Sequence, residues 1–194
     1  MLALYFTPGS SSLAAHIALH ETGADFEGRP ISLARGEQRD AAFLALNPAG
    51  QVPLLLIDGR PLTEVLAILF YLARRFPEAR LLPEGGLEAE ARALSWMSFV
   101  AATLHPARTQ PMEQAMRTWL VAEQRLGGAE WALGGRYSIA DIHLFRLFWR
   151  FAGSRHPEPG RLPGLEAHAA RVMARPAVRR TFEVEEAIGY HLPP

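Results

Sequence analysis

The sequence contains no cysteine among its 194 residues. This absence excludes disulfides, metal sites built from thiolates and a cysteine nucleophile. Acidic and basic residues number 20 each, which gives a formal net charge of zero. A balanced charge provides no general attraction to nucleic acid or to an anionic membrane, so neither is an expected partner.

Long apolar runs and nucleotide-binding fingerprints are also missing. No uninterrupted apolar stretch reaches the roughly 20 residues that a membrane-spanning helix requires. Met1 leads directly into a strand-like sequence without a basic segment, so we expect no signal peptide and a cytoplasmic protein. His16 and His20 have the helical spacing of metal ligands, but no third ligand is evident and no metal is expected.

The most informative stretch, residues 47–76, begins with a predicted hairpin. Pro53 precedes the apolar run Leu54–Ile57, and a proline, which has no N–H to donate, suits the start of a strand. Asp58-Gly59 predicts a two-residue turn, because glycine accepts the positive φ of a type I′ turn. A short return strand ends at Leu62.

A buried helix is expected after this hairpin. Thr63 can cap its N-terminus, and Glu64 suits the positive end of the helix dipole. The helix is apolar on nearly all sides, Arg74 and Arg75 favour its C-terminus, and Pro77 stops it. A rigid extended backbone beside a helix N-terminus is suited to holding a small peptide that carries a carboxylate.

The string N-P-x-G-x-V-P, followed by L-T-E and a hydrophobic helix, resembles the glutathione-binding domain of cytosolic glutathione transferases. The resemblance implies that Pro53 is cis and that Val52 pairs its backbone with the cysteinyl unit of glutathione. It also implies that Glu64 and the N–H of Val65 bind the γ-glutamyl end. Most members have Ser or Thr at the position of Val65, which here offers only its N–H. Gln51 completes the predicted glutathione-binding string.

The remainder of the N-terminal region is consistent with this resemblance. Strands are expected at Leu2–Phe6 and Phe26–Ile31, a helix runs to about His20, and a short helical turn covers Ala41–Leu46. With the hairpin and the buried helix, the order is β-α-β-α-β-β-α, a thioredoxin-like α/β arrangement.

The second part of the chain is expected to be all-helical. Residues 77–86 contain two prolines and two glycines and are predicted to form a linker between a domain at 1–76 and a helical domain at 87–194. The expected helices are Leu87–His105, Pro111–Leu126, Tyr137–Ala152, Leu162–Arg175 and Pro176–Ile188. Ser138 and Asp141 form a capping-box pattern, so we assign Asp141 to folding, with a loss of about 1 kcal/mol or more on its removal.

Glutathione chemistry requires a thiolate, whereas a free thiol has a reference pKa of about 8.5. A hydroxyl donor and a helix N-terminus lower that pKa, and the T-P-G-S-S-S turn supplies both. In the similar bacterial beta-class enzymes the turn reads T-P-G-x-C-S-L, and its cysteine falls on Ser11. The tyrosine of other classes falls on Phe6. Ser11 is therefore the first candidate, as in theta- and zeta-type members, and Ser10 the second. The alternative is that the serines only cap the helix.

Leu104-His105-Pro106 resembles a beta-class stretch in which the histidine faces the thiol. His105 is therefore a candidate donor to the thiolate or to a substrate, and the alternative is a histidine that complements the helix dipole. The segment between His105 and Ser138 is shorter than in most relatives, so the resemblance does not identify the substrate.

Further contacts follow from the resemblance. Arg35 lies where relatives keep a basic residue for the glycyl carboxylate, Arg39 is a substitute, and an ordinary surface arginine is the alternative. Ser98 and Thr103 lie on the helix that lines the two-fold interface of the family and reaches the neighbour's glutathione, which implies a homodimer. The sequence thus predicts a transferase that uses glutathione as co-substrate and attacks a small electrophile. A non-catalytic binding or regulatory protein of the same fold is the alternative.

Overall fold

The computed structural model describes residues 1–189, which belong to two compact units. One unit combines Met1–Ala79 with the last helix, and the other is Arg80–Arg175. This grouping differs from the predicted domains in the last helix, which we expected to belong to the helical domain at 87–194. No helix in the described part of the chain has the length and apolar character needed to cross a membrane.

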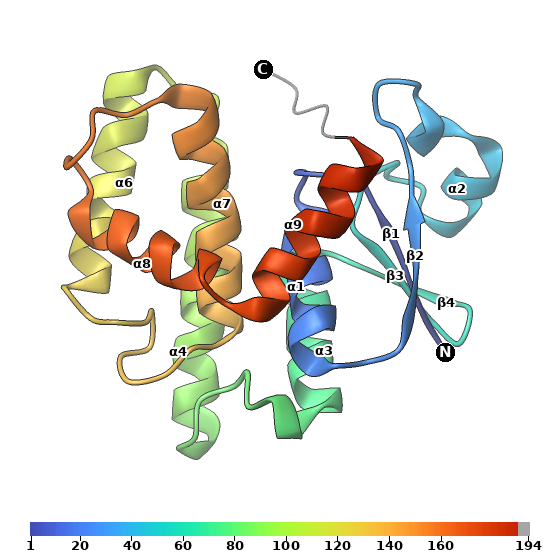
Figure 1. Ribbon diagram of the computed structural model, residues 1–194, viewed down its shortest axis with the longest axis horizontal. Coiled ribbons are helices and arrows are strands. Elements are labelled where there is room, and N and C mark those ends of the chain that lie inside the picture. The colour runs from blue at the N-terminus through green and yellow to red at the C-terminus, as the bar shows by residue number, and fades with distance from the viewer. Residues whose placement is uncertain (190–194) are drawn as a thin grey trace. The chain divides into compact units, whose positions relative to one another are not determined.

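The first unit is built on a four-stranded mixed sheet (Figure 1). Its strands are β1 Leu2–Phe6, β2 Phe26–Pro30, β3 Leu54–Ile57 and β4 Arg60–Thr63, in the order β2-β1-β3-β4. β1 pairs in parallel with β2 and antiparallel with β3, and β3 and β4 form the predicted hairpin. The predicted βαβαββα order is therefore confirmed.

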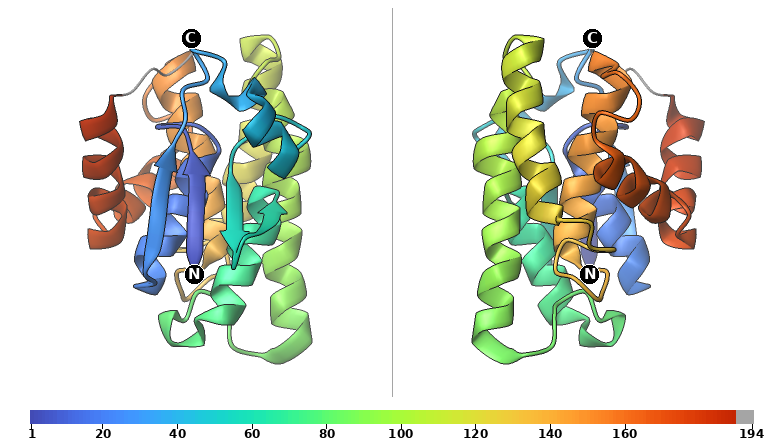
Figure 2. Two further views of the ribbon diagram at one scale, coloured as in Figure 1. Left: turned by 90° about the vertical axis from the view of Figure 1, so that its right-hand side faces the viewer. Right: turned by 90° about the vertical axis from the view of Figure 1, so that its left-hand side faces the viewer.

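Helices cover both faces of this sheet. They are α1 Ser12–Thr22, α2 Ala41–Leu46, α3 Val65–Arg75 and α9 Pro176–Ile188, with short 3₁₀ turns η1 Glu37–Arg39 and η2 Pro77–Ala79. α1 packs against both α3 and α9. The views show α1 and α3 on one face and α2 on the other (Figures 1 and 2). Because both faces are covered, the central strands are apolar on both sides.

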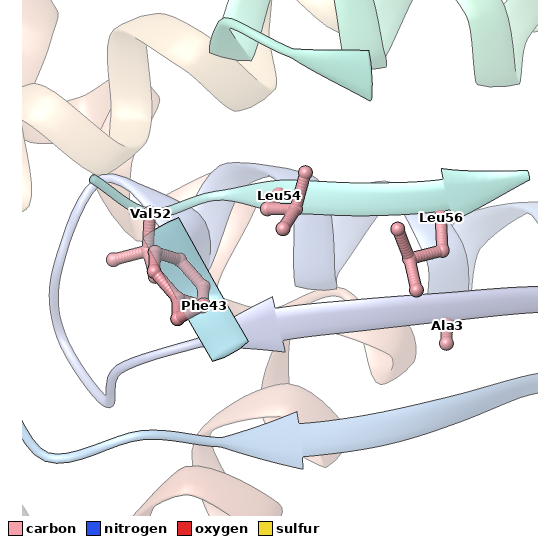
Figure 3. Close-up of a cluster of buried hydrophobic side chains, with 5 residues drawn as sticks. All are labelled: Ala3, Phe43, Val52, Leu54 and Leu56. Carbon is pink, nitrogen blue, oxygen red and sulfur yellow. The ribbon is translucent and has the colours of Figure 1, made fainter. Parts of the chain in front are cut away.

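The α2 face holds a compact apolar cluster that reaches the predicted binding string (Figure 3). Phe43 of α2 packs against Ala3, Leu54 and Leu56, which point to the same face because side chains alternate along a strand. Val52 belongs to this cluster and is 8% exposed. The backbone immediately before β3 is therefore anchored in the core.

The start of α3 differs from the sequence prediction. Thr63 is not the helix cap, because it is the last residue of β4 and pairs with Leu54 of β3. Glu64 takes the cap position with φ 69°, and its carbonyl accepts the N–H of Ile68 at 3.0 Å. Because Thr63 is paired within β4, it lies one residue before the N-cap position of α3. The chain turns from β4 into α3 at Glu64, whose backbone is left-handed.

The second unit is all-helical, as predicted. Its elements are α4 Gly86–Phe99, the π-helical segment η3 Val100–Leu104, α5 His105–Ala107, α6 Met112–Leu126, α7 Ile139–Arg155 and α8 Pro163–Met173. The regular helix expected from 87 to 105 is therefore interrupted by a π segment. The predicted capping box is present at the start of α7, where Ser138 and Asp141 exchange hydrogen bonds with the backbone.

Candidate functional site

The turn between β1 and α1 is closed by its own hydroxyls. The Oγ of Ser12 donates to the carbonyl of Thr7 at 3.1 Å and accepts the N–H of Thr7 at 3.1 Å. Ser10 Oγ lies 2.7 Å from Ser12 Oγ. Ser12 is fully buried, so its hydroxyl maintains the turn and is shielded from a ligand. The alternative of a purely structural serine therefore applies to Ser12.

Ser11 is arranged differently. It makes no side-chain capping bond to α1, is only partly buried, and donates its hydroxyl to the carbonyl of Val52 at 2.7 Å. The Val52–Pro53 peptide is cis, as the resemblance implied. The structure thus places the first serine candidate directly against the backbone expected to pair with the cysteinyl unit, although 41 residues separate the two in sequence.

A buried asparagine, which the sequence reasoning missed, holds the approach to this backbone. Asn47 Nδ2 donates to the carbonyl of Gln51 at 2.8 Å, and its Oδ1 accepts the N–H of Ala49 at 3.2 Å. Gly50 has φ 60°, and a Cβ there would meet the carbonyl oxygen of Gln38 at 3.1 Å. The Asn-Pro-x-Gly string was the available signal, because asparagine and glycine both favour such turns.

The other end of the predicted site is the N-terminus of α3. Glu64 is exposed, and among the described residues its carboxylate has no hydrogen-bond partner. Val65 is the first residue of the helix, where backbone N–H groups have no partner within the helix. An exposed carboxylate beside free amides can accept an ammonium and donate to a carboxylate, the two ends of an amino-acid group.

Arg35 is exposed but already paired. Its Nε and Nη2 both lie 2.8 Å from Glu37 Oε1. The Ser32 N–H, and after it the Arg35 guanidinium, hold the pKa of Glu37 below its ordinary value. Arg35 also lines a pocket of about 350 Å³ together with Thr7 and Pro8 of the serine turn. An incoming carboxylate at Arg35 therefore has to compete with Glu37.

The final helix holds the serine turn through a residue that the sequence reasoning did not select. Glu185 is fully buried, and its Oε2 accepts the N–H of Gly9 at 2.8 Å. Its Oε1 accepts from His16 Nδ1 at 2.8 Å. Val178, Thr181 and Glu185 are the buried positions of α9, at helical spacing. A carboxylate on an otherwise inward-facing stripe was the signal that this residue has buried partners.

His16 and His20 both form hydrogen bonds to side chains of α9 and are not arranged as a metal site. His20 Nδ1 is hydrogen-bonded to Thr181 Oγ1 at 2.8 Å. Burial, and after it His16 and Arg180, lower the pKa of His20 to about 4. No group of three or more potential ligands that could hold a metal occurs within residues 1–189.

His105, in the second unit, follows the π segment directly. Its N–H donates to the carbonyl of Val100, the bond that closes the π turn. Burial, and after it Arg146 and Arg108, lower the pKa of His105 to about 4, so the imidazole is uncharged at neutral pH. Ser98 and Thr103 are both exposed on their helical segments.

Comparison with known proteins gives a consistent result along nearly the whole chain. Residues 1–74 match the family "Glutathione S-transferase, N-terminal domain", and residues 90–176 match "Glutathione S-transferase, C-terminal domain". Glutathione S-transferase GstA of Escherichia coli O157:H7 is 33% identical over 203 residues, covering 96% of this chain and 97% of the relative.

Two further relatives indicate the range of the similarity. A sphingomonad glutathione S-transferase, solved in complex with glutathione, superposes with a TM-score of 0.84 at 34% identity and covers 95% of this chain and 98% of its own. Maleylacetoacetate isomerase of Pseudomonas aeruginosa is 33% identical over 157 residues, covering 70% of this chain and 74% of the relative.

Proposed function

The chain belongs to the glutathione S-transferase family, and from that premise we propose that its first unit holds one glutathione site in which Ser11 stabilises the thiolate. The protein is a glutathione transferase. The observation that carries the assignment of Ser11 is its 2.7 Å hydrogen bond to the carbonyl of Val52. A cysteinyl unit paired with the Val52 backbone brings its sulfur close to this hydroxyl.

In this proposal the thiolate is stabilised because the Ser11 hydroxyl exchanges a neutral hydrogen-bond acceptor for a charged one. When glutathione binds, the Ser11 hydroxyl leaves the neutral carbonyl of Val52 and donates to the sulfur. Hydrogen bonds to a charged acceptor are stronger than those between neutral groups, so the exchange favours the thiolate. The N-terminus of α1, eleven residues long, adds its positive dipole end. The thiolate then attacks a small electrophile.

Other residues bind the γ-glutamyl and glycyl units of the tripeptide. The Glu64 carboxylate accepts the γ-glutamyl ammonium, and the N–H of Val65 donates to the γ-glutamyl carboxylate. Gln51, beside Val52, contributes through its backbone or side chain. Arg35 releases Glu37 and pairs with the glycyl carboxylate, which a guanidinium binds in bidentate geometry.

Glu64→Ala tests the site as a whole. Calorimetry is expected to show that the intact protein binds glutathione. The affinity of Glu64→Ala is expected to be roughly tenfold to a hundredfold lower, because a charge-assisted hydrogen bond is lost. Glu78→Ala is the matched control, since Glu78 is an exposed acid of the same unit outside the site. Absence of glutathione binding to the intact protein contradicts the proposal.

Ser11→Ala tests the hydroxyl. The pKa of the bound thiol, measured from thiolate absorbance against pH, is expected to rise, and turnover is expected to fall roughly tenfold to a hundredfold. Glutathione affinity changes much less, because the other contacts remain. If Ser10→Ala raises the thiol pKa and Ser11→Ala does not, the role belongs to Ser10. If neither does, the donor is His105 or a backbone N–H.

The similarity to maleylacetoacetate isomerase supports glutathione-dependent isomerisation as a second candidate reaction. Both reactions start from the same thiolate. Chemistry that requires a mixed disulfide with the protein is excluded, because the chain has no cysteine.

We place the protein in the cytoplasm as a homodimer whose interface includes the exposed Ser98 and Thr103. The position of both residues on the α4–η3 surface supports this, together with the interface use of that helix in the family. Light scattering at micromolar concentration is expected to give twice the chain mass, and a monomer contradicts the assignment.

A further inference from the structure

A cavity of about 480 Å³ lies along the open edge of the sheet in the first unit. β2 is an edge strand, because the strand order is β2-β1-β3-β4. α9 stands on the α1 face of the sheet, on the side of β2 (Figures 1 and 2). The lining comes mainly from β2, α1 and α9, and we call this space the edge cavity.

A glycine in β2 leaves the edge cavity open. Phe26, Gly28 and Pro30 alternate along the strand to one face and line the cavity together. Gly28 pairs regularly with Leu4 and its φ is not positive, so the backbone does not require a glycine there. A Cβ would meet Phe6 Cε1 at 3.4 Å. Glycine inside a regular strand weakens it and often marks the close approach of a ligand.

Four rings form one wall of the edge cavity. The ring centroids of Phe6 and His16 lie 4.6 Å apart, and those of His16 and His20 lie 4.8 Å apart. Phe26 lies 5.7 Å from His16 and 5.4 Å from His20. All four residues line the cavity. These are the distances at which aromatic rings attract one another, so an aromatic molecule can extend the wall by the same contacts.

The opposite wall is an exposed apolar stripe of α9. Arg180, Val184 and Ile188 follow one another at intervals of four residues and line the cavity from one side of the helix. Val184 is 36% exposed and Ile188 is 45% exposed. They are two of the five large apolar side chains that remain exposed within residues 1–189. A molecule in the cavity would remove apolar surface of both from water, which is favourable.

His20 presents a hydrogen-bond acceptor. The Thr181 hydroxyl donates to the carbonyl of Ala177 at 2.8 Å, so its oxygen accepts from His20 Nδ1, also at 2.8 Å. The hydrogen of the ring is therefore on Nδ1, and Nε2 has a lone pair. Nε2 has no hydrogen-bond partner in the described part of the chain. The lowered pKa of His20, about 4, keeps this ring uncharged at neutral pH.

The charges around the edge cavity do not favour an ion of either sign. Among the described residues, one acid, Asp25, and one arginine, Arg180, line it, and both are exposed. Exposed charges are screened by water and contribute little. The Nδ1 of His16 is already engaged by Glu185. The polar atom best suited to selective recognition is therefore Nε2 of His20.

We propose that the edge cavity binds an uncharged aromatic alcohol of the phenol class, whose ring packs on the aromatic wall and whose hydroxyl donates to Nε2 of His20. A phenolic hydroxyl has a reference pKa of about 10, so it keeps its hydrogen at neutral pH. The ring would cover Val184 and Ile188 and use the space that Gly28 leaves. This site is additional to the proposed transferase function, because none of its lining residues belongs to the proposed glutathione site.

A matched pair of probes provides the test. 2-Naphthol carries a hydroxyl, and its methyl ether, 2-methoxynaphthalene, cannot donate a hydrogen bond. Binding of each is followed by the anisotropy of its own fluorescence at pH 7. Saturating S-hexylglutathione is present, so that the proposed glutathione site and the space beside its sulfur are occupied. The intact protein is expected to bind 2-naphthol roughly fivefold more tightly than the ether, as one net hydrogen bond provides.

Variants assign this binding to the edge cavity. His20→Phe keeps the ring and removes the acceptor, so it is expected to abolish the preference for the alcohol. Gly28→Val and Val184→Trp fill the cavity from β2 and from α9, and each is expected to weaken both probes at least tenfold. Val184 is an exposed position, so its variant tests the cavity even if Gly28→Val does not fold. Val121→Trp, at an exposed valine of the second unit, is the control without effect.

Four results overturn the proposal. They are no binding of 2-naphthol, binding no tighter than that of its ether, displacement of 2-naphthol by S-hexylglutathione, and unchanged affinity in Val184→Trp. Displacement would mean that the probe occupies the space beside the glutathione sulfur. 2-Naphthoate tests the charge of the ligand separately. If it binds more tightly than 2-naphthol and this binding is lost in Arg180→Gln, the cavity is an anion site and the phenol class is wrong.

Discussion

Replacing Asp141 with alanine is expected to lower the free energy of unfolding by about 3–5 kcal/mol, the usual cost of removing one partner of a buried charged network. Asp141 is fully buried. Its Oδ1 accepts the N–H of Ala132 at 2.6 Å and lies 2.9 Å from His168 Nε2. Its Oδ2 accepts both the N–H and the hydroxyl of Ser138, at 2.8 and 2.9 Å.

Four partners explain why this expected loss exceeds the approximately 1 kcal/mol of a helix cap alone. Asp141→Asn is expected to destabilise the protein as well, because the NH2 group that replaces one carboxylate oxygen cannot accept a hydrogen bond from Ser138. Urea unfolding followed by circular dichroism measures both. Glu130→Ala, which changes an exposed acid of the same unit, is the control. A loss of only about 1 kcal/mol in Asp141→Ala contradicts the network interpretation.

Glu185→Ala is expected to destabilise the first unit by a similar amount, about 3–5 kcal/mol, and to lower transferase turnover. The substitution leaves the buried N–H of Gly9 and the Nδ1 of buried His16 without their acceptor. Gly9 precedes the serines directly, so the turn that presents Ser11 loses its tie to α9. Unfolding and turnover are therefore expected to change together.

Two variants separate this effect from general disturbance of α9. Glu185→Gln keeps the shape and one acceptor oxygen, and it is expected to give an intermediate loss. Glu186→Ala removes the neighbouring acid, which is exposed, and is expected to change neither quantity. Equal stability of Glu185→Ala and Glu186→Ala in urea refutes the role assigned to Glu185.

Local chemistry was sufficient for the elements whose determinants lie within a few residues. The hairpin at Asp58-Gly59 forms with φ values of 49° and 81°, which this pair adopts at low cost. The Ser138–Asp141 capping box forms because both partners lie in one helical turn. The order of strands and helices in the first unit follows from the same kind of local signal, and family motifs identified the chemistry.

Local signals were insufficient where a residue's neighbour is distant or where two neighbouring elements compete. Thr63 was expected to cap α3, but pairing with β3 retained it in a strand. Three adjacent serines are equivalent in sequence. Only folding turned Ser12 inward to Thr7 and brought Ser11 against Val52.

The sequence by itself determined the succession of strands and helices along the first unit, the hairpin and the capping box, because each is encoded by residue types at short spacing. The tertiary structure decided which serine lies against the Val52 backbone and which carboxylate holds the turn. Glu185 and Gly9 are 176 residues apart, so no local pattern relates them. Their contact exists because α9 packs on α1, and a buried carboxylate there requires the N–H of Gly9 and the imidazole of His16 as partners.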